Sequence, residues 1–419
     1  MNDKERNKSG GGVLGFPMFR SFQNPPYRLY LPGSLFQFAA LSMQIVTGPM
    51  LMFRLSDSPA LLGTMALISG LPMVFLSLFG GAWADRISKK WIVIAGFLAG
   101  SVVAIAVALM LANGIISADK PGSWWILIGA IFLMACIMGV MMPALQSLVA
   151  EIVSRDQLLN AVALNTMGMN ILSFIAPYFA GFMIDTFDFH SVYYTMAGMY
   201  VLGAFFIAFL PGKEETRIES GNVMQEIRKG IQYIRKDSFI LTILLYSLLA
   251  TIFSMPYQQL LPIFVDEILA VGATGMGVLL SVSGAGAFVG SIALALLPNK
   301  KRGIILLASG IISGVGLVVF SFSTIWSLSI SIMILVGLGQ TLRMTIGSAL
   351  LQTYSDPEYR GRVMSIFSMQ WGLMSVCTFL AGIAAESLPV QWVLGSLALI
   401  LITLSIMSIV FLPRIRRLD

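Results

Sequence analysis

The chain reads Gly80-Gly81-Ala82-Trp83-Ala84-Asp85-Arg86-Ile87-Ser88-Lys89-Lys90 between two long apolar runs. The run before it covers Ala60–Ala84, and the run after it covers Trp91–Ala112. Each run reaches the length of about 20 apolar residues that a helix needs to cross the hydrocarbon layer of a membrane. The polar stretch therefore predicts a tight turn between two membrane-spanning helices.

The composition extends this prediction to the whole chain. Of the 419 residues, 57% are hydrophobic and only 11% are charged, with a mean hydropathy of +0.86, which excludes an ordinary water-soluble protein. The two cysteines, Cys136 and Cys377, lie in apolar runs, and His190 is the single histidine. These residues cannot supply a metal cluster, a redox pair or a nucleophilic triad, so we expect no enzyme activity, no catalytic residues, no metal and no cofactor.

Apolar runs of spanning length recur six times before a polar centre and six times after it. They predict an all-α membrane protein with twelve transmembrane helices in two six-helix bundles. The predicted spans cover 28–55, 60–84, 91–112, 124–149, 158–184 and 191–210, followed by 239–264, 274–297, 303–322, 326–351, 363–385 and 390–412.

The basic residues predict the orientation of these spans. Of the 26 Lys and Arg residues, 23 fall on one side, only Arg54 and Lys120 fall on the other, and Arg343 lies inside a span. Cytoplasmic loops carry the excess of positive charge, so both termini are expected in the cytoplasm. The net charge of +6 then reflects insertion and contact with anionic lipid, and we expect no nucleic acid partner. The expected domains are a cytoplasmic N-terminal tail (1–27), an N-terminal bundle (28–211), a cytoplasmic linker (212–238), a C-terminal bundle (239–412) and a cytoplasmic C-terminal tail (413–419).

The linker has the pattern of an amphipathic helix. Val223, Ile227, Ile231 and Ile234 recur at helical spacing between charged residues. Such a helix lies on a membrane surface, and a tether between the two bundles is favoured over a regulatory site.

The two halves also share an internal repeat. Gly63 with Ser69-Gly70 in the second span recurs as Gly277 with Ser283-Gly284 in the eighth, and Ala180-Gly181 in the fifth recurs as Ala381-Gly382 in the eleventh. A parallel repeat of six and six spans is typical of transporters that rock around a central site. Small residues also serve close helix packing alone, which is the alternative at each position.

With twelve spans around it, the polar turn matches G-x-x-x-D-R-x-x-K-K and strongly resembles the loop signature of the major facilitator superfamily. The resemblance covers all twelve spans. It implies a conformational-switch loop made of Gly81, Asp85, Arg86, Lys89 and Lys90. In that family the acid engages the start of a helix of the second half and latches the outward-open state, which assigns this role to Asp85. A carboxylate at a helix N-terminus gains about 0.3–1 kcal/mol, and the alternative is a solvated loop acid.

Two other segments extend the resemblance. Ala176-Pro177-Tyr178-Phe179-Ala180-Gly181 looks like a degenerate form of the G-P-x-x-G-G motif of antiporters in this superfamily, although Pro177 could simply bend the helix. The segment 356–363 resembles the P-x-x-R-G-R-V loop of bacterial drug, macrolide and siderophore exporters and of lysophospholipid flippases. The family implies the proton as coupling ion, yet span four lacks the arginine of the proton-coupled drug antiporters and no span carries an acid at its middle.

By the same resemblance, spans one, four, seven and ten face a central substrate cavity. Their candidate lining residues are Gln37, Gln44, Thr47, Met134, Met138, Met141, Ser247, Thr251, Ser254, Gln258, Gln340 and Arg343. Methionine and sparse amides suit bulky amphipathic ligands, because thioether chains reshape around different molecules, but each methionine could also be plain packing. Arg343 could face the cavity or extend its side chain to the inner headgroups.

These observations predict a secondary transporter of the bacterial cytoplasmic membrane, a monomer in contact with membrane lipid. It would export an amphipathic drug-like or siderophore-like small molecule by alternating access. The alternatives are a lysophospholipid flippase of the same fold and a transport-dead membrane sensor or scaffold.

Overall fold

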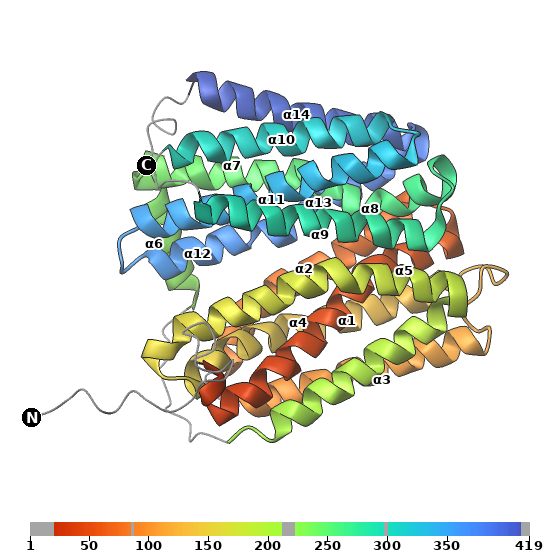
Figure 1. Cartoon of the computed structure of the whole chain (residues 1–419), viewed down its shortest axis with the longest axis horizontal. Coiled ribbons are helices and arrows are strands. Elements are labelled where there is room, and N and C mark those ends of the chain that lie inside the picture. Colours follow the sequence, from red (N-terminus) through yellow and green to blue (C-terminus); the bar gives the residue numbers. More distant parts are fainter. Residues whose placement is uncertain (1–20, 85–87, 212–222, 297–300, 412–419) are drawn as a thin grey trace, which may run out of the picture.

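The computed structural model describes residues 21–84, 88–211, 223–296 and 301–411, and within them every regular element is a helix. Figure 1 shows these helices in two bundles, the first half of the chain below the second. The prediction of an all-α protein with two helical bundles is confirmed. We call the end of the molecule where α1 finishes the acidic end, because Asp185, Asp266 and Glu386 lie there. The opposite end, where α1 begins, is called the basic end.

The first bundle contains five long helices. They are α1 (Pro25–Ser56), α2 (Pro59–Ala84), α3 (Lys89–Ala112), α4 (Trp124–Ile152) and α5 (Arg155–Ala208). The 54 residues of α5 do not run straight, because Asp188 has φ 69° and ψ 169° and turns the chain back. This helix therefore contains the fifth and sixth predicted spans.

The second bundle follows a short surface helix, α6 (Val223–Lys236). Its elements are α7 (Ser238–Ser254), α8 (Pro256–Ile263), the π-helix η3 (Phe264–Ile268), α9 (Gly272–Leu296), α10 (Arg302–Phe322), α11 (Trp326–Tyr354), α12 (Arg360–Ser368), α13 (Gln370–Ser387) and α14 (Val390–Phe411). Ten segments of the described chain are long and apolar enough to cross a membrane. Because α5 makes two crossings and α2 adds another, the number of spans agrees with the twelve that the sequence predicts.

The seventh span is not the continuous helix that the sequence predicts over 239–264. It breaks at Met255, continues as α8 and ends in η3 at Ile268. Pro256 causes the break, because proline has no backbone N–H to donate and its ring clashes with the preceding turn. The eleventh span is likewise divided, at Met369 between α12 and α13.

Two long helix pairs join the bundles: α5 packs along α9, and α2 packs along α13. The glycines of the internal repeat lie at these crossings. A Cβ added to Gly181 would lie 2.2 Å from the carbonyl oxygen of Ala273, and one added to Gly277 would lie 2.4 Å from that of Pro177. A Cβ added to Gly382 would lie 2.6 Å from the backbone oxygen of Pro59, and one added to Gly63 would lie 2.9 Å from that of Phe379. The repeat thus marks the two places where the halves approach backbone to backbone.

The surface helix α6 packs on α12 at the basic end. The rings of Tyr233 and Tyr359 stack with centroids 4.3 Å apart, and the backbone N–H of Asp356 donates to the Tyr233 hydroxyl at 3.0 Å. The surface helix α6 therefore packs against the segment 356–363, which resembles the exporter loop.

Candidate functional site

Two basic residues of the switch loop, Lys89 and Lys90, contact other elements of the first bundle. Lys89 pairs with Glu151 of α4, and Lys90 donates to the backbone oxygen of Leu210 at 2.5 Å. Asp85 and Arg86 lie outside the described residues, and Gly81 lies in α2. The role that the resemblance gives to Asp85 stays a prediction.

Candidate cavity residues of spans one and four are in contact, because the Gln37 amide of span one hydrogen-bonds to Met138 of span four. The Nε2 of Gln37, 1% exposed, donates to the sulfur atoms of Met138 and Met142 at 3.6 and 3.2 Å. The buried Thr47 hydroxyl donates to the backbone oxygen of Met43 at 2.9 Å in its own helix. Half-buried Gln44 lies beside Tyr193.

The methionines of span four contact different helices. A Cβ added to Gly96 of α3 would lie 2.6 Å from the sulfur of Met141. A Cβ added to Gly100 of the same helix would lie 3.7 Å from the sulfur of Met134. These two side chains therefore pack on α3, inside the first bundle. Met138 instead contacts Gln37 of α1.

Arg343 is the centre of a polar network inside the second bundle. Its side chain is 1% exposed, and its Nη1 donates to the Thr251 hydroxyl oxygen at 2.5 Å and, less closely, to the backbone oxygen of Ser247 at 3.4 Å. Its Nη2 donates to the Ser254 hydroxyl oxygen at 2.9 Å. Serine and threonine spaced along α7 therefore supply partners for Nη1 and Nη2 of Arg343, which explains the polar stripe that the sequence shows on span seven.

The position of these partners shows that Arg343 does not extend toward the headgroups. Thr251 and Ser254 lie in the last turn of α7, whose first residue, Ser238, is at the basic end. At 1.5 Å per residue they are about 20 Å from that end. The guanidinium is therefore buried among neutral groups, far along α7 from the basic end.

A glutamine extends this network to a third helix. The Thr251 hydroxyl lies 2.8 Å from Oε1 of Gln370, to which it donates, and Gln370 is 2% exposed at the start of α13. Among the described buried atoms, Nε of Arg343, Oγ of Ser247 and Nε2 of Gln340 have no hydrogen-bond partner. Gln340 and Gln258 lie beside the Tyr257 hydroxyl, which accepts from Nε2 of Gln258 at 3.4 Å.

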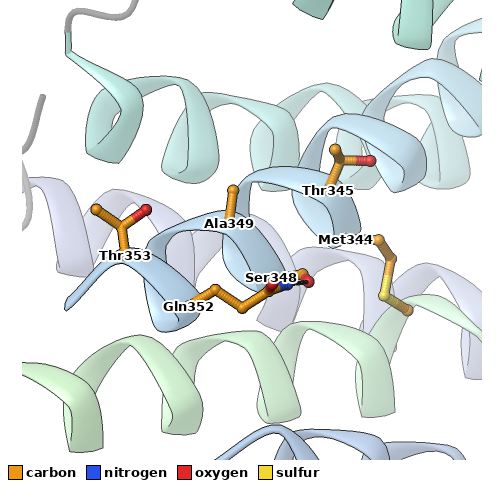
Figure 2. Close-up of a pocket in the computed structure, with 6 residues that line it drawn as sticks. All are labelled: Met344, Thr345, Ser348, Ala349, Gln352 and Thr353. Atoms are coloured by element: carbon orange, nitrogen blue, oxygen red, sulfur yellow. Dashed lines mark hydrogen bonds between the residues drawn. The ribbon is translucent and has the colours of Figure 1, made fainter. Parts of the chain in front are cut away.

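A pocket of about 590 Å³ lies on the basic-end half of α11, next to this network (Figure 2). Its lining residues all project from α11: Met344, Thr345, Ser348, Ala349, Gln352 and Thr353. Figure 2 shows Gln352 reaching Ser348, to whose hydroxyl oxygen its Nε2 donates at 2.9 Å. The sulfur of Met344 lies 3.8 Å from Nε2 of Gln370, so the pocket wall touches the Arg343 network.

This pocket is not among the sites that the sequence predicts. Thr345, Ser348 and Gln352 follow one another at spacings of three and four, a polar stripe that helical periodicity could have revealed. Gln352 and Thr353 lie beyond the predicted end of span ten at Leu351, so the stripe extends past the predicted span.

The antiporter-like segment forms the crossing between α5 and α9. Ala176 and Ala180 are buried at 5% and 0% exposed, and the backbone oxygen of Pro177 faces Gly277. With Gly181 against Ala273, this segment brings the two bundles into contact.

Polar side chains connect the two bundles at the acidic end. The Arg54 guanidinium of α1 pairs with Asp266 of η3 at 3.2 Å. Asp185 of α5 accepts two hydrogen bonds from Thr274 of α9. Glu386 of α13 accepts from Ser58 and from the backbone N–H of Ala60 in α2. The amide of Gln259 in α8 donates to the backbone oxygen of Leu62 at 3.2 Å.

Comparison with known proteins gives this architecture a family. Residues 19–419 match the model of a major facilitator family described as transmembrane secretion effector. The chain belongs to this family. It is a membrane transporter of the major facilitator type and not an enzyme.

The transporter has curated relatives in several bacteria. It is 24% identical to an uncharacterized MFS-type transporter, YfiS, of Bacillus subtilis (strain 168), over 83% of this chain and 82% of that protein. It is also 24% identical to macrolide efflux protein A of Streptococcus pyogenes, over 92% of this chain and 95% of that protein. A protein of the same name from Enterococcus faecalis is 24% identical over 76% of this chain and 97% of its own length.

Solved structures share the fold of the transporter. A mutant of a peptide transporter POT in complex with sulfate superposes with a TM-score of 0.74 at 14% identity, covering 97% of this chain and 96% of that one. The nucleoside transporter NupG superposes with a TM-score of 0.72 at 14% identity, covering 93% and 99%. The described part of this transporter contains no cluster of three His, Cys, Asp or Glu residues able to hold a metal ion.

Proposed function

We propose that this transporter exports a bulky amphipathic molecule, of the drug, macrolide or siderophore kind, across the bacterial cytoplasmic membrane by alternating access. The observation that carries the proposal is the pocket on α11 near the basic end. At the acidic end, an ion pair and hydrogen bonds join the two halves of the molecule. With both termini cytoplasmic, this is an inward-facing arrangement, ready to take up a ligand from the cell or the inner leaflet.

The chemistry of the pocket favours an amphipathic ligand over a charged one. Its lining offers one thioether, three hydroxyl groups and one amide, but no charged side chain. Its volume of about 590 Å³ is within the range of sites for drug-sized molecules. Met344 supplies a side chain that adapts to different shapes, and Ser348 and Gln352 supply hydrogen bonds that orient a ligand.

The transport cycle would exchange one set of contacts between the halves for another. Opening of the acidic end requires the bonds of Arg54, Asp185 and Glu386 to break. In the outward-open state, the loop acid Asp85 would engage a helix start of the second half and stabilise closure of the basic end. A proton gradient is the proposed source of energy, and the monomer is the proposed functional unit.

Accumulation in bacterial cells tests the proposal. Cells expressing the protein are exposed to a macrolide panel, a hydroxamate siderophore and a fluorescent lysophospholipid, and the retained amount is compared with cells that lack the protein. We expect lower retention of at least one macrolide or siderophore with the parent protein. Removal of the lysophospholipid alone would replace the proposal with a flippase. No change for any compound, at normal membrane insertion, would contradict transport and favour a sensor or scaffold.

A further inference from the structure

Asp185 closes the acidic end by capping a helix of the opposite half. Its Oδ2 accepts from the backbone N–H of Thr274 at 2.7 Å and from the Thr274 hydroxyl at 2.6 Å. Thr274 lies in the first turn of α9, where backbone N–H groups have no partner within the helix. A carboxylate at this position satisfies the N–H group and interacts favourably with the helix dipole. The first half therefore holds the second by its α9 N-terminus.

Glu386 makes the reciprocal contact. Its Oε1 accepts from the backbone N–H of Ala60 at 3.3 Å and from the Ser58 hydroxyl. Ala60 lies in the first turn of α2, which begins at Pro59. Here an acid of the second half caps a helix of the first half. The two caps thus cross between the bundles in opposite directions.

The positions of the two caps are equivalent in the internal repeat. Asp185 follows Ala180-Gly181 by four residues, and Glu386 follows Ala381-Gly382 by four residues. The capped residues correspond as well, since Thr274 precedes Gly277 by three and Ala60 precedes Gly63 by three. The glycines bring the backbones together, and the acid then reaches the helix start one turn further on.

One of the two caps has additional charges around it. Nη2 of Arg54 lies 3.8 Å from Asp185, and Nε of the same side chain lies 3.2 Å from Asp266. Arg54 thereby joins the first cap to η3, at the end of the broken seventh span.

We infer that Asp185 and Glu386 are paired latches, related by the internal repeat, which together set the balance between the inward-facing and outward-open states. When the acidic end opens, both carboxylates leave their helix N-termini at once. Removing either charge weakens only the closed acidic end, so the equilibrium shifts toward opening there. This inference depends on the transporter fold and on no particular substrate.

Distance measurement between spin labels at the acidic end tests the inference without a ligand. Labels are placed at Lys120→Cys in the first half and Ile325→Cys in the second, after Cys136 and Cys377 are replaced by serine. Both labelled positions are exposed. Asp185→Asn and Glu386→Gln are each expected to increase the long-distance population severalfold, and the double variant to increase it further. Asp119→Asn is the matched control, because this acid bonds only to Ser117 in its own loop among the described contacts.

A milder substitution, Thr274→Val, keeps the inference testable if the charge-removing variants do not fold. Thr274→Val removes one hydroxyl donor and keeps the backbone N–H, so we expect a smaller shift in the same direction. Unchanged distances in the double variant would overturn the inference, and a shift with only one of the two single variants would overturn the equivalence of the caps. Because the readout is a distance, failure here is distinct from failure to export any compound.

Discussion

The Nη1 atom of Arg343 lies 2.5 Å from the Thr251 hydroxyl oxygen, on a neighbouring helix and closed to solvent. No described carboxylate forms an ion pair with this guanidinium. A charge at this depth costs about 2.5 kcal/mol or more unless hydrogen bonds or water compensate. The hydroxyl groups of α7 supply that compensation, so the stability of the second bundle depends on them.

Thr251→Val is expected to destabilise the protein by about 1–3 kcal/mol, because it removes an acceptor from a buried donor and also breaks the bond to Gln370. Thermal unfolding in detergent measures the change. Thr242→Val is the matched control on α7, since that hydroxyl donates to the backbone of Ser238 in its own helix. Equal midpoints for the two variants would contradict a stabilising role for Thr251.

Arg343→Met separates stability from function. The substitution removes a charge that is costly inside a membrane span, and Thr251 keeps its hydrogen bond to Gln370, so we expect the variant to fold. Transport is expected to fall strongly, with partial retention in Arg343→Lys, because Arg343 adjoins the pocket residue Met344 and the Gln370 network. Transport at the parental rate by Arg343→Met would reduce this residue to a packing element.

Gly181→Ala is expected to force the two bundles apart. The added Cβ would lie 2.2 Å from the backbone oxygen of Ala273, a distance that neighbouring backbone cannot accommodate without moving. Overpacking of this kind costs about 1–3 kcal/mol, which would appear as a lower thermal midpoint. Gly198→Ala on the same helix is the control, because a Cβ there meets nothing within 4 Å. A midpoint for Gly181→Ala at or above that of Gly198→Ala would refute the close approach.

Ser348→Leu and Gln352→Leu are expected to fill the pocket and remove its orienting hydrogen bonds. Both variants should raise the KM for bulky substrates more than for small ones, as measured by initial rates of transport. Ser331→Leu serves for comparison, because this exposed residue of α11 lies outside the pocket and donates to its own helix. The same KM in all three variants would remove the pocket from the substrate path.

The sequence was sufficient to predict the helical class, the number of spans and the repeat, because apolar length and repeated small residues are local properties of the chain. The partners of Arg343 were harder to predict. A polar stripe on span seven looks the same whether it faces water or a buried guanidinium, and only packing distinguishes the two. The break at Met255 was missed because apolar residues continue through it, although Pro256 carried the signal.

The caps at the acidic end show the same limit. Asp185 and Glu386 look like ordinary loop-side acids, and their sequence gives no indication of which helix start they reach. Their partners come from the other half of the chain, so neither periodicity nor charge counting could pair them.

Transport by purified protein in liposomes tests the central claim of substrate export most directly. A fluorescent macrolide is presented to the face that carries the linker, and its movement into the lumen is followed under an imposed proton gradient. We expect gradient-dependent uptake by the parent protein, weakened in Ser348→Leu and lost in Arg343→Met. Uptake that is equal in protein-free liposomes, or insensitive to both substitutions, would contradict it.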